Sequence, residues 1–178
     1  MSMPADTPST LSVTQLRILN AVAFQACWFA CVIGGSLWGA IAVGLFFAWH
    51  QRISSRFEWL FIIAIAGIGS ALDTLWYQLG LIGFPAYELA VIPVWLFLLW
   101  LAFAATLLHS LNYLFSRPLF ITLASAVAAP GSYYAGQRLG ALETNTYGLM
   151  TISVSWAVLM GIAALISQRY SDRLKPAN

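Results

Sequence analysis

The chain has 178 residues, of which 61% are hydrophobic and only 8% are charged, and its formal net charge is +2. A soluble globular domain carries about 25% charged residues, so this chain has too few to cover a water-exposed surface. The composition therefore excludes a soluble domain, a disordered chain, a disulfide framework and a nucleic-acid-binding module, and it predicts an integral membrane protein.

Both ends of the chain are polar. Residues 1–10 contain no lysine or arginine, which the start of a secretory signal peptide would require. We expect residues 1–14 to form a disordered cytoplasmic tail and residues 170–178 to form a second cytoplasmic tail. Cys27 and Cys31 lie four residues apart in the first apolar segment, and we interpret them as packing residues on one side of a helix.

Six apolar segments lie between residues 15 and 169, separated by glycine, proline or charged residues. A membrane-spanning helix needs about 20 apolar residues, so six helices use nearly all of this length and form one domain. The predicted helices cover residues 16–33, 36–50, 57–79, 92–115, 118–139 and 147–167.

The second segment is short for a membrane span. Its apolar part, from Leu37 to Trp49, rises only about 20 Å as a helix, whereas the hydrocarbon core is about 30 Å thick. Three arrangements fit: the helix borrows residues from the Gly34-Gly35-Ser36 turn, the first two segments form a shallow hairpin, or one continuous helix runs from Leu16 to Trp49.

The positive residues distinguish these arrangements. With the N-terminus in the cytoplasm, six crossings place seven of the eight positive residues on the cytoplasmic side, as the positive-inside rule requires. These are Arg17, Arg52, Arg56, Arg117, Arg169, Arg173 and Lys175, and only Arg138 lies outside. A single merged first helix would separate Arg17 from Arg52. We therefore predict an all-α integral membrane protein, a six-helix transmembrane bundle with both termini cytoplasmic.

Ionisable residues at membrane depth cost about 2.5–3.5 kcal/mol each and are therefore default functional candidates. Asp73 lies about 24 Å along its helix, in the outer leaflet, and the helix over 118–139 brings Arg138 to a similar height. Because Arg138 is the only cation on that side, we expect an Asp73–Arg138 ion pair. Pro130 should free the carbonyl of Ala126 and kink the same helix.

These residues predict an outward-opening polar pocket. The candidate catalytic residues are Asp73, Tyr134 and, in a separate cluster, His109. The candidate ligand-binding residues are Arg138, Tyr133, Gln137, Glu143 and Trp76. Two other interpretations remain open: the Asp73–Arg138 pair is a structural pin between two helices, or the side chains snorkel separately to the lipid interface.

His109 is expected about 9 Å from the cytoplasmic end of its helix, beside Ser110. A histidine there either relays protons or acts as a general base, or it hydrogen-bonds Asn20 or Gln25 and holds two helices together. Asp73 and His109 differ by roughly 15 Å in depth, so we do not expect them to form one catalytic pair.

Several sequence motifs are absent. The chain has no histidine-rich box, no Asp-x-x-x-Asp run, no His-Glu-x-x-His motif and no glycine-rich phosphate loop. We therefore expect no metal site and no cofactor.

Four segments resemble a bacterial family catalogued as a domain of unknown function, number 2878. They are FQACWFACVIGG, LDTLWYQLGLIGFP, PVWLFLLWLAFAATLLHSLNYL and RPLFITLASAVAAPGSYYAGQRLGALE. The resemblance places the family's polar and turn positions at Asp73, His109, Ser110, Pro130, Tyr134, Gly136 and Glu143. It implies a six-helix protein of the bacterial inner membrane with no established activity, whose genes lie beside lipid-modifying methyltransferases of the cyclopropane-fatty-acid-synthase type.

Three functions follow as hypotheses. The first is membrane-lipid handling or modification, as an enzyme or an accessory to one, in which Arg138 binds an anionic headgroup and Asp73 orients it or accepts a proton. The alternatives are a non-catalytic scaffold for a lipid-modifying enzyme and a small proton-coupled transporter. The expected partners are membrane lipids and a lipid-modifying enzyme, with a homodimer as a further expectation and no nucleic acid.

Overall fold

The computed structural model describes residues 12–52 and 54–174. Most of the predicted N-terminal tail, together with Lys175, lies outside the described residues. The first helix, α1 (Val13–His50), begins with a capping box, in which the Ser12 side chain accepts from the backbone of Gln15 and the Gln15 side chain accepts from the backbone of Ser12.

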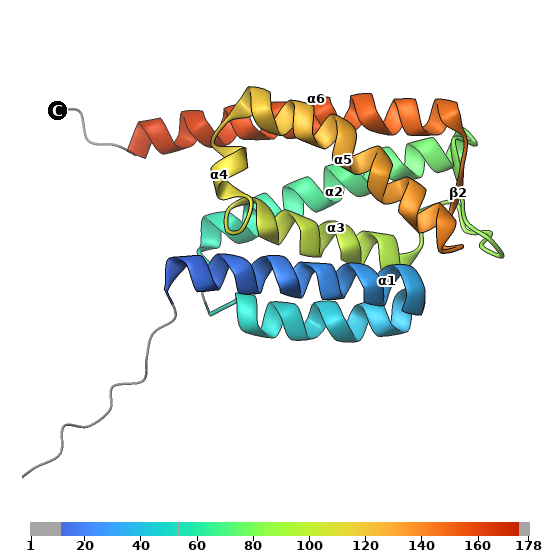
Figure 1. Ribbon diagram of the computed structural model, residues 1–178, viewed down its shortest axis with the longest axis horizontal. Helices are drawn as coiled ribbons and strands as arrows, with labels where there is room; N and C mark the ends of the chain where they lie inside the picture. The colour runs from blue at the N-terminus through green and yellow to red at the C-terminus, as the bar shows by residue number, and fades with distance from the viewer. Residues whose placement is uncertain (1–11, 53, 175–178) are drawn as a thin grey trace, which may run out of the picture.

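A sharp turn at Gly35 divides α1 into two limbs, residues 13–34 and 36–50 (Figure 1). Gly35 has φ 67° and ψ −157°, a conformation that is open almost only to glycine. The limbs run antiparallel, and Gly39 of the second approaches Cys31 of the first, where an added Cβ would lie 2.9 Å from the Cys31 sulfur. The chain is therefore a helical hairpin here and not one continuous helix.

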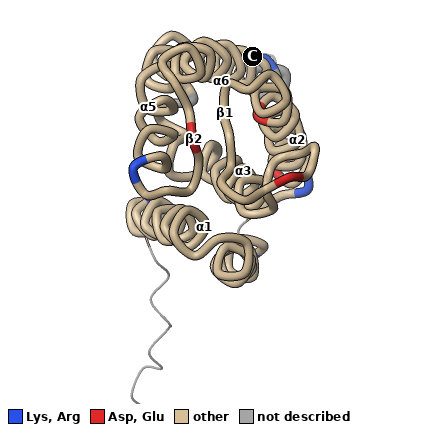
Figure 2. The backbone as a smooth tube through the Cα atoms, turned by 90° about the vertical axis from the view of Figure 1, so that its right-hand side faces the viewer, with Lys and Arg blue, Asp and Glu red and all other residues tan. Residues whose placement is uncertain are grey.

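Four further helices cross the molecule in alternating directions (Figure 1): α2 (Arg56–Gln78), α3 (Val94–Leu107), α5 (Pro118–Arg138) and α6 (Thr146–Leu174). The single turn α4 (Asn112–Phe115) lies between α3 and α5 at one end of the bundle. Two short strands, β1 (Ile82–Gly83) and β2 (Glu143–Thr144), pair antiparallel and tie the loop after α2 to the loop after α5. Figure 2 views the bundle from the end that carries these strands.

The predicted helix over 92–115 is interrupted. Residues 108–111 form a turn between α3 and α4, in which the amides of His109 and Leu111 both donate to the carbonyl of Thr106. The turn lets two side chains reach other helices: His109 contacts Glu58 of α2, and Ser110 donates to Asn20 of α1. These tertiary contacts outweigh the helical preference of the local sequence.

Pro130 lies inside α5 and cannot donate to the carbonyl of Ala126, as the sequence predicts. The Ser153 hydroxyl of α6 donates to that carbonyl at 2.6 Å. The group that proline leaves unpaired therefore becomes a contact between α5 and α6, which pack along their length.

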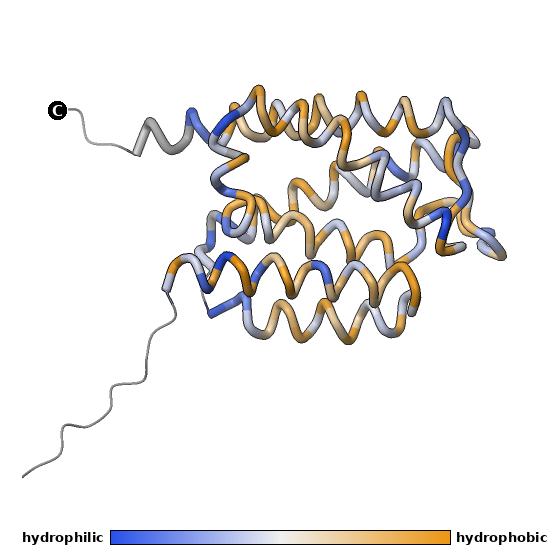
Figure 3. The backbone as a smooth tube through the Cα atoms, viewed as in Figure 1, coloured by the Kyte–Doolittle hydropathy of each residue, from blue (hydrophilic) through white to orange (hydrophobic). Residues whose placement is uncertain are grey.

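Three described helices are long and apolar enough to cross a membrane: Val13–His50, Glu58–Gln78 and Thr146–Arg169. Val94–Leu107 is apolar but shorter. Hydrophobic residues run along the helices, and hydrophilic residues gather toward the ends of the bundle (Figure 3). The chain thus has the helices of a membrane protein.

The two ends of the bundle differ in charge. Arg17 lies in the first turns of α1, Arg56 begins α2, Arg117 precedes α5 and Arg169 lies near the end of α6, so all four are at the end where α1 starts and α6 stops. Arg138 ends α5 at the opposite end.

Candidate functional site

A groove with a volume of about 900 Å³ lies between the first limb of α1, α3 and α5, with α6 behind it. Its walls are almost entirely apolar, and their aromatic residues include Phe24, Trp28, Trp100, Phe103 and Trp156. Trp100 stacks on Trp156 with ring centroids 4.5 Å apart, so two indoles form a continuous wall. A cavity of this volume is typical of small-molecule sites.

Few polar groups line the groove. The indole of Trp28 donates to the Ser132 hydroxyl at 2.9 Å and so joins α1 to α5. At the end of α5, the exposed side chains of Tyr134 and Arg138 also line the groove. The groove therefore combines an apolar body with a tyrosine and a cation at one end.

Asp73 lies behind the wall of this groove and is only 2% exposed. Its Oδ2 accepts from Tyr133 of α5 at 2.5 Å and from Trp100 of α3 at 2.7 Å. Tyr133 and Trp100 both line the groove, whereas Asp73 does not. The carboxylate therefore orients two side chains of the wall without reaching the open space.

The expected Asp73–Arg138 ion pair does not form. Among residues 12–52 and 54–174, no salt bridge joins the two side chains, and Arg138 is exposed while Asp73 is buried. The physical reason is that two neutral donors, a phenol and an indole, satisfy Asp73 inside the bundle, so the arginine remains at the surface.

The other predicted pocket residues lie apart from the groove. The Gln137 amide donates to the carbonyl of Thr144 at 3.0 Å and so holds the loop that carries β2. Glu143 is an exposed residue of β2, and Trp76 is half-buried against the core. Of the predicted ligand-binding set, the structure brings Tyr133 and Arg138 to the groove, together with the catalytic candidate Tyr134.

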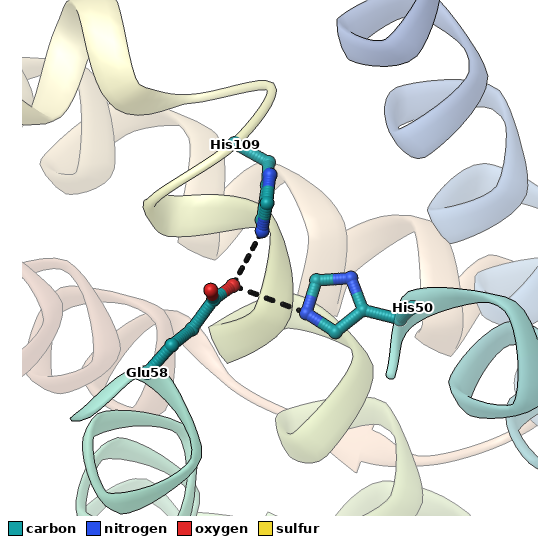
Figure 4. A group of neighbouring side chains, drawn as sticks. All are labelled: His50, Glu58 and His109. Atoms are coloured by element: carbon teal, nitrogen blue, oxygen red, sulfur yellow. Dashed lines mark hydrogen bonds and ion pairs between the residues drawn. The ribbon is translucent and has the colours of Figure 1, made fainter. Parts of the chain in front are cut away.

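A second cluster lies at the opposite end of the bundle, where Glu58 faces two histidines (Figure 4). Glu58 Oε1 lies 2.5 Å from His109 Nε2, with which it shares a hydrogen bond, and 3.2 Å from His50 Nε2. His50 is the last residue of α1, Glu58 lies in the first turn of α2, and His109 lies in the turn after α3. Three helix ends thus meet at one carboxylate.

A capping box positions Glu58. The Ser55 side chain accepts from the Glu58 amide at 3.3 Å, and Glu58 Oε2 accepts from the Ser55 amide at 3.4 Å. The start of a helix also favours a negative side chain. One carboxylate oxygen is therefore held by the backbone, and the other faces the histidines.

His50 is fully buried, at 0% exposed, in an aromatic enclosure. Its ring stacks on Phe46 with centroids 5.3 Å apart and also contacts Phe47 and Trp59. Although Nε2 lies near Glu58, neither ring nitrogen of His50 makes a hydrogen bond within the described part of the chain.

His109 was predicted to contact Asn20 or Gln25 or to act in proton transfer. In the structure, the hydroxyl of the neighbouring Ser110 donates to Asn20 Oδ1 at 2.7 Å, and His109 instead pairs with Glu58.

The sequence did not predict His50 and Glu58 as site residues. The only local signal was the capping box Ser55-Arg56-Phe57-Glu58, which predicts a helix start and no chemistry.

Comparison with known proteins identifies a family of unknown function. No curated protein and no solved structure matches the chain. A family model does match, over residues 17–162, which is most of the chain and includes Asp73, His109, Tyr133 and Arg138. The chain therefore belongs to the family described as protein of unknown function (DUF2878).

Proposed function

We propose that this protein is a multi-pass protein of the bacterial inner membrane that binds a membrane lipid and takes part in the handling or modification of membrane lipids. The observation that carries the proposal is the apolar groove between α1, α3 and α5, with Tyr134 and Arg138 at one end. An acyl chain lies against the aromatic wall, and the guanidinium of Arg138 binds the anionic headgroup.

The orientation follows from charge. The end of the bundle where α1 starts carries Arg17, Arg52, Arg56, Arg117 and Arg169, and this excess of positive residues supports a cytoplasmic position for that end. Arg138 and the mouth of the groove beside it then lie at the outer leaflet. Both termini are cytoplasmic in this orientation.

In this proposal Asp73 is a positioning residue. It holds Tyr133 and Trp100 in the groove wall through two hydrogen bonds and does not touch the lipid. Tyr134 and Arg138 are the polar groups at the end of the groove that face the headgroup.

Lipid binding is tested on purified full-length protein in mild detergent, by quantifying copurified lipid and by titrating phosphatidylglycerol and phosphatidylethanolamine. We expect preferential binding of the anionic phosphatidylglycerol. Replacing groove-lining Ala128 by tryptophan should narrow the groove and weaken binding. Val127→Trp is the matched control, because Val127 is 76% exposed on the same helix and lies outside the groove.

The headgroup is tested separately. Arg138→Gln should remove the preference for the anionic lipid, and Arg169→Gln, an exposed arginine at the other end, should leave it unchanged. Equal lipid binding by wild type and Ala128→Trp would overturn the proposal.

A further inference from the structure

We propose that His50, Glu58 and His109 form a binding site for one divalent transition-metal ion, of the class of Zn²⁺ and Fe²⁺, at the end of the bundle opposite Arg138. The site is independent of the groove and of the proposed lipid function. Each residue offers one ligand atom, and the three atoms lie within 4.8 Å of one another (Figure 4).

The donor set has the right chemistry for such an ion. Two imidazoles and one carboxylate bind catalytic zinc in several enzyme classes and bind Fe²⁺ in the facial-triad sites of oxygenases. In both cases three protein ligands leave at least one coordination position for water or a substrate. Ca²⁺ and Mg²⁺ prefer oxygen ligands and fit this set poorly.

The burial of His50 is an independent observation. An imidazole at 0% exposure should have both nitrogens paired, yet within the described residues Nδ1 has no hydrogen-bond partner and Nε2 has only its ion-pair contact with Glu58 Oε1. This contact is 3.2 Å long and lies on the side where the metal would bind. Coordination of a metal through Nε2 would satisfy this nitrogen.

Burial of Glu58 supports the same conclusion. Its side chain is 9% exposed, and a buried carboxylate needs a compensating positive charge. Within the described part of the chain, its ion-pair partners are His50 and His109, which carry a positive charge only when protonated, and no arginine or lysine pairs with it. A divalent cation between the carboxylate and two neutral histidines would provide the charge.

The three ligand atoms, which lie within 4.8 Å of one another, must move to coordination distance. Ligand atoms about 2.0–2.2 Å from a tetrahedral metal lie about 3.3 Å from each other. The distance from His50 Nε2 to Glu58 Oε1 is already 3.2 Å, and that from His109 Nε2 to the same oxygen, 2.5 Å, would open by about 1 Å. His109 lies in the turn between α3 and α4, so this movement leaves both helices intact.

The structure also provides orientation and access. Ser55 holds Glu58 Oε2, which leaves Oε1 for the metal, and Asn20 holds Ser110 next to His109. The His109 side chain is 22% exposed, whereas His50 is enclosed by aromatic rings. The open coordination position therefore lies on the side of His109.

The test is metal binding by full-length protein in detergent. The chain has only two histidines, so the polyhistidine purification tag must be absent. After chelator treatment and desalting, Zn²⁺ is titrated by calorimetry, and Fe²⁺ is titrated under anaerobic conditions. Co²⁺ serves as the spectroscopic probe, since its visible absorption reports the geometry and the nitrogen ligands. We expect one ion per chain and a higher unfolding temperature in its presence.

Substitution of each ligand has a defined result. His50→Ala, His109→Ala and Glu58→Gln should each weaken Zn²⁺ binding by more than about 100-fold, because loss of a direct ligand exceeds the 10–100-fold effect of an outer-shell change. Glu88→Gln is the matched control, since Glu88 is exposed in the loop after β1. Glu58→Gln keeps a side-chain oxygen for the Ser55 cap, so its fold should survive.

Two outcomes would overturn the site. Folded wild-type protein that binds no stoichiometric Zn²⁺, Fe²⁺ or Co²⁺ would show that the cluster is a buried ion pair between Glu58 and a protonated histidine. Equal binding by wild type, Glu58→Gln and His109→Ala would place the ion elsewhere. If His50→Ala fails to fold, the Co²⁺ spectrum of wild type and its change in His109→Gln still decide the question.

Discussion

Tyr133 of α5 donates a hydrogen bond of 2.5 Å to Asp73 of α2, across 60 residues of sequence. Trp100 of α3 donates to the same carboxylate oxygen, so one buried acid joins three helices. This contact, and not an ion pair with Arg138, is how the protein accommodates Asp73 in an apolar bundle.

Removing the Tyr133 hydroxyl should lower stability. In Tyr133→Phe, Asp73 keeps only Trp100 as a donor, and we expect a loss of about 1–3 kcal/mol in the free energy of unfolding. SDS titration of the purified protein measures this. Tyr134→Phe changes the adjacent, exposed tyrosine and should have no effect; equal losses in both variants would contradict the assignment.

Gly69 is required by the position of Trp100. A Cβ added at Gly69 would overlap the indole ring of Trp100, which must then leave its hydrogen bond with Asp73. We expect Gly69→Ala to destabilise the protein by about 1–3 kcal/mol. Gly67→Ala is the control on the same helix, because its Cβ meets nothing within 4 Å, and it should be neutral or stabilising. The same SDS titration compares the two variants.

Ser153 should matter because Pro130 is present. Ser153→Ala leaves the carbonyl of Ala126 without its donor, at a cost of about 1–3 kcal/mol. In a Pro130→Ala background the backbone amide of residue 130 can donate to that carbonyl, so the Ser153→Ala substitution should cost less. A double-mutant cycle of unfolding free energies measures the coupling. Additive losses would mean that the serine acts independently of the proline.

The proposed orientation predicts which positions an impermeant thiol reagent reaches in intact bacterial cells. Glu88→Cys and Glu143→Cys, at the β1–β2 end, should be labelled, whereas Gln51→Cys and Ser116→Cys should react only after the membrane is opened. The native Cys27 and Cys31 are buried and give a low background. Labelling of Ser116→Cys in intact cells would reverse the orientation.

Much of the fold could be predicted from the local sequence. The break at Gly34-Gly35-Ser36 predicted the turn that divides α1, since glycine there permits a backbone that other residues avoid. Pro130 predicted the free carbonyl of Ala126. The pattern did not predict the turn at residues 108–111, because local propensity does not include the contacts of His109 with Glu58 and Ser110 with Asn20.

The candidate sites were harder to predict from the sequence. Asp73 and Arg138 were expected to pair because both are ionisable and at similar height along their helices. Height along a helix says nothing of the rotation of its side chains, and the carboxylate turns toward Trp100 and Tyr133. His50, Glu58 and His109 match no metal motif, because motifs describe ligands on one element and these lie on three.

The sequence alone determined that the chain forms apolar helices, because only 8% of its residues are charged. The positions of glycine and proline determined where these helices are divided. The tertiary structure decided which partners the charged side chains have. Burial requires each polar group to find a partner, and the partner is whichever group the packing of distant helices brings near. That packing gives Asp73 a phenol and an indole, and gives Glu58 two histidines.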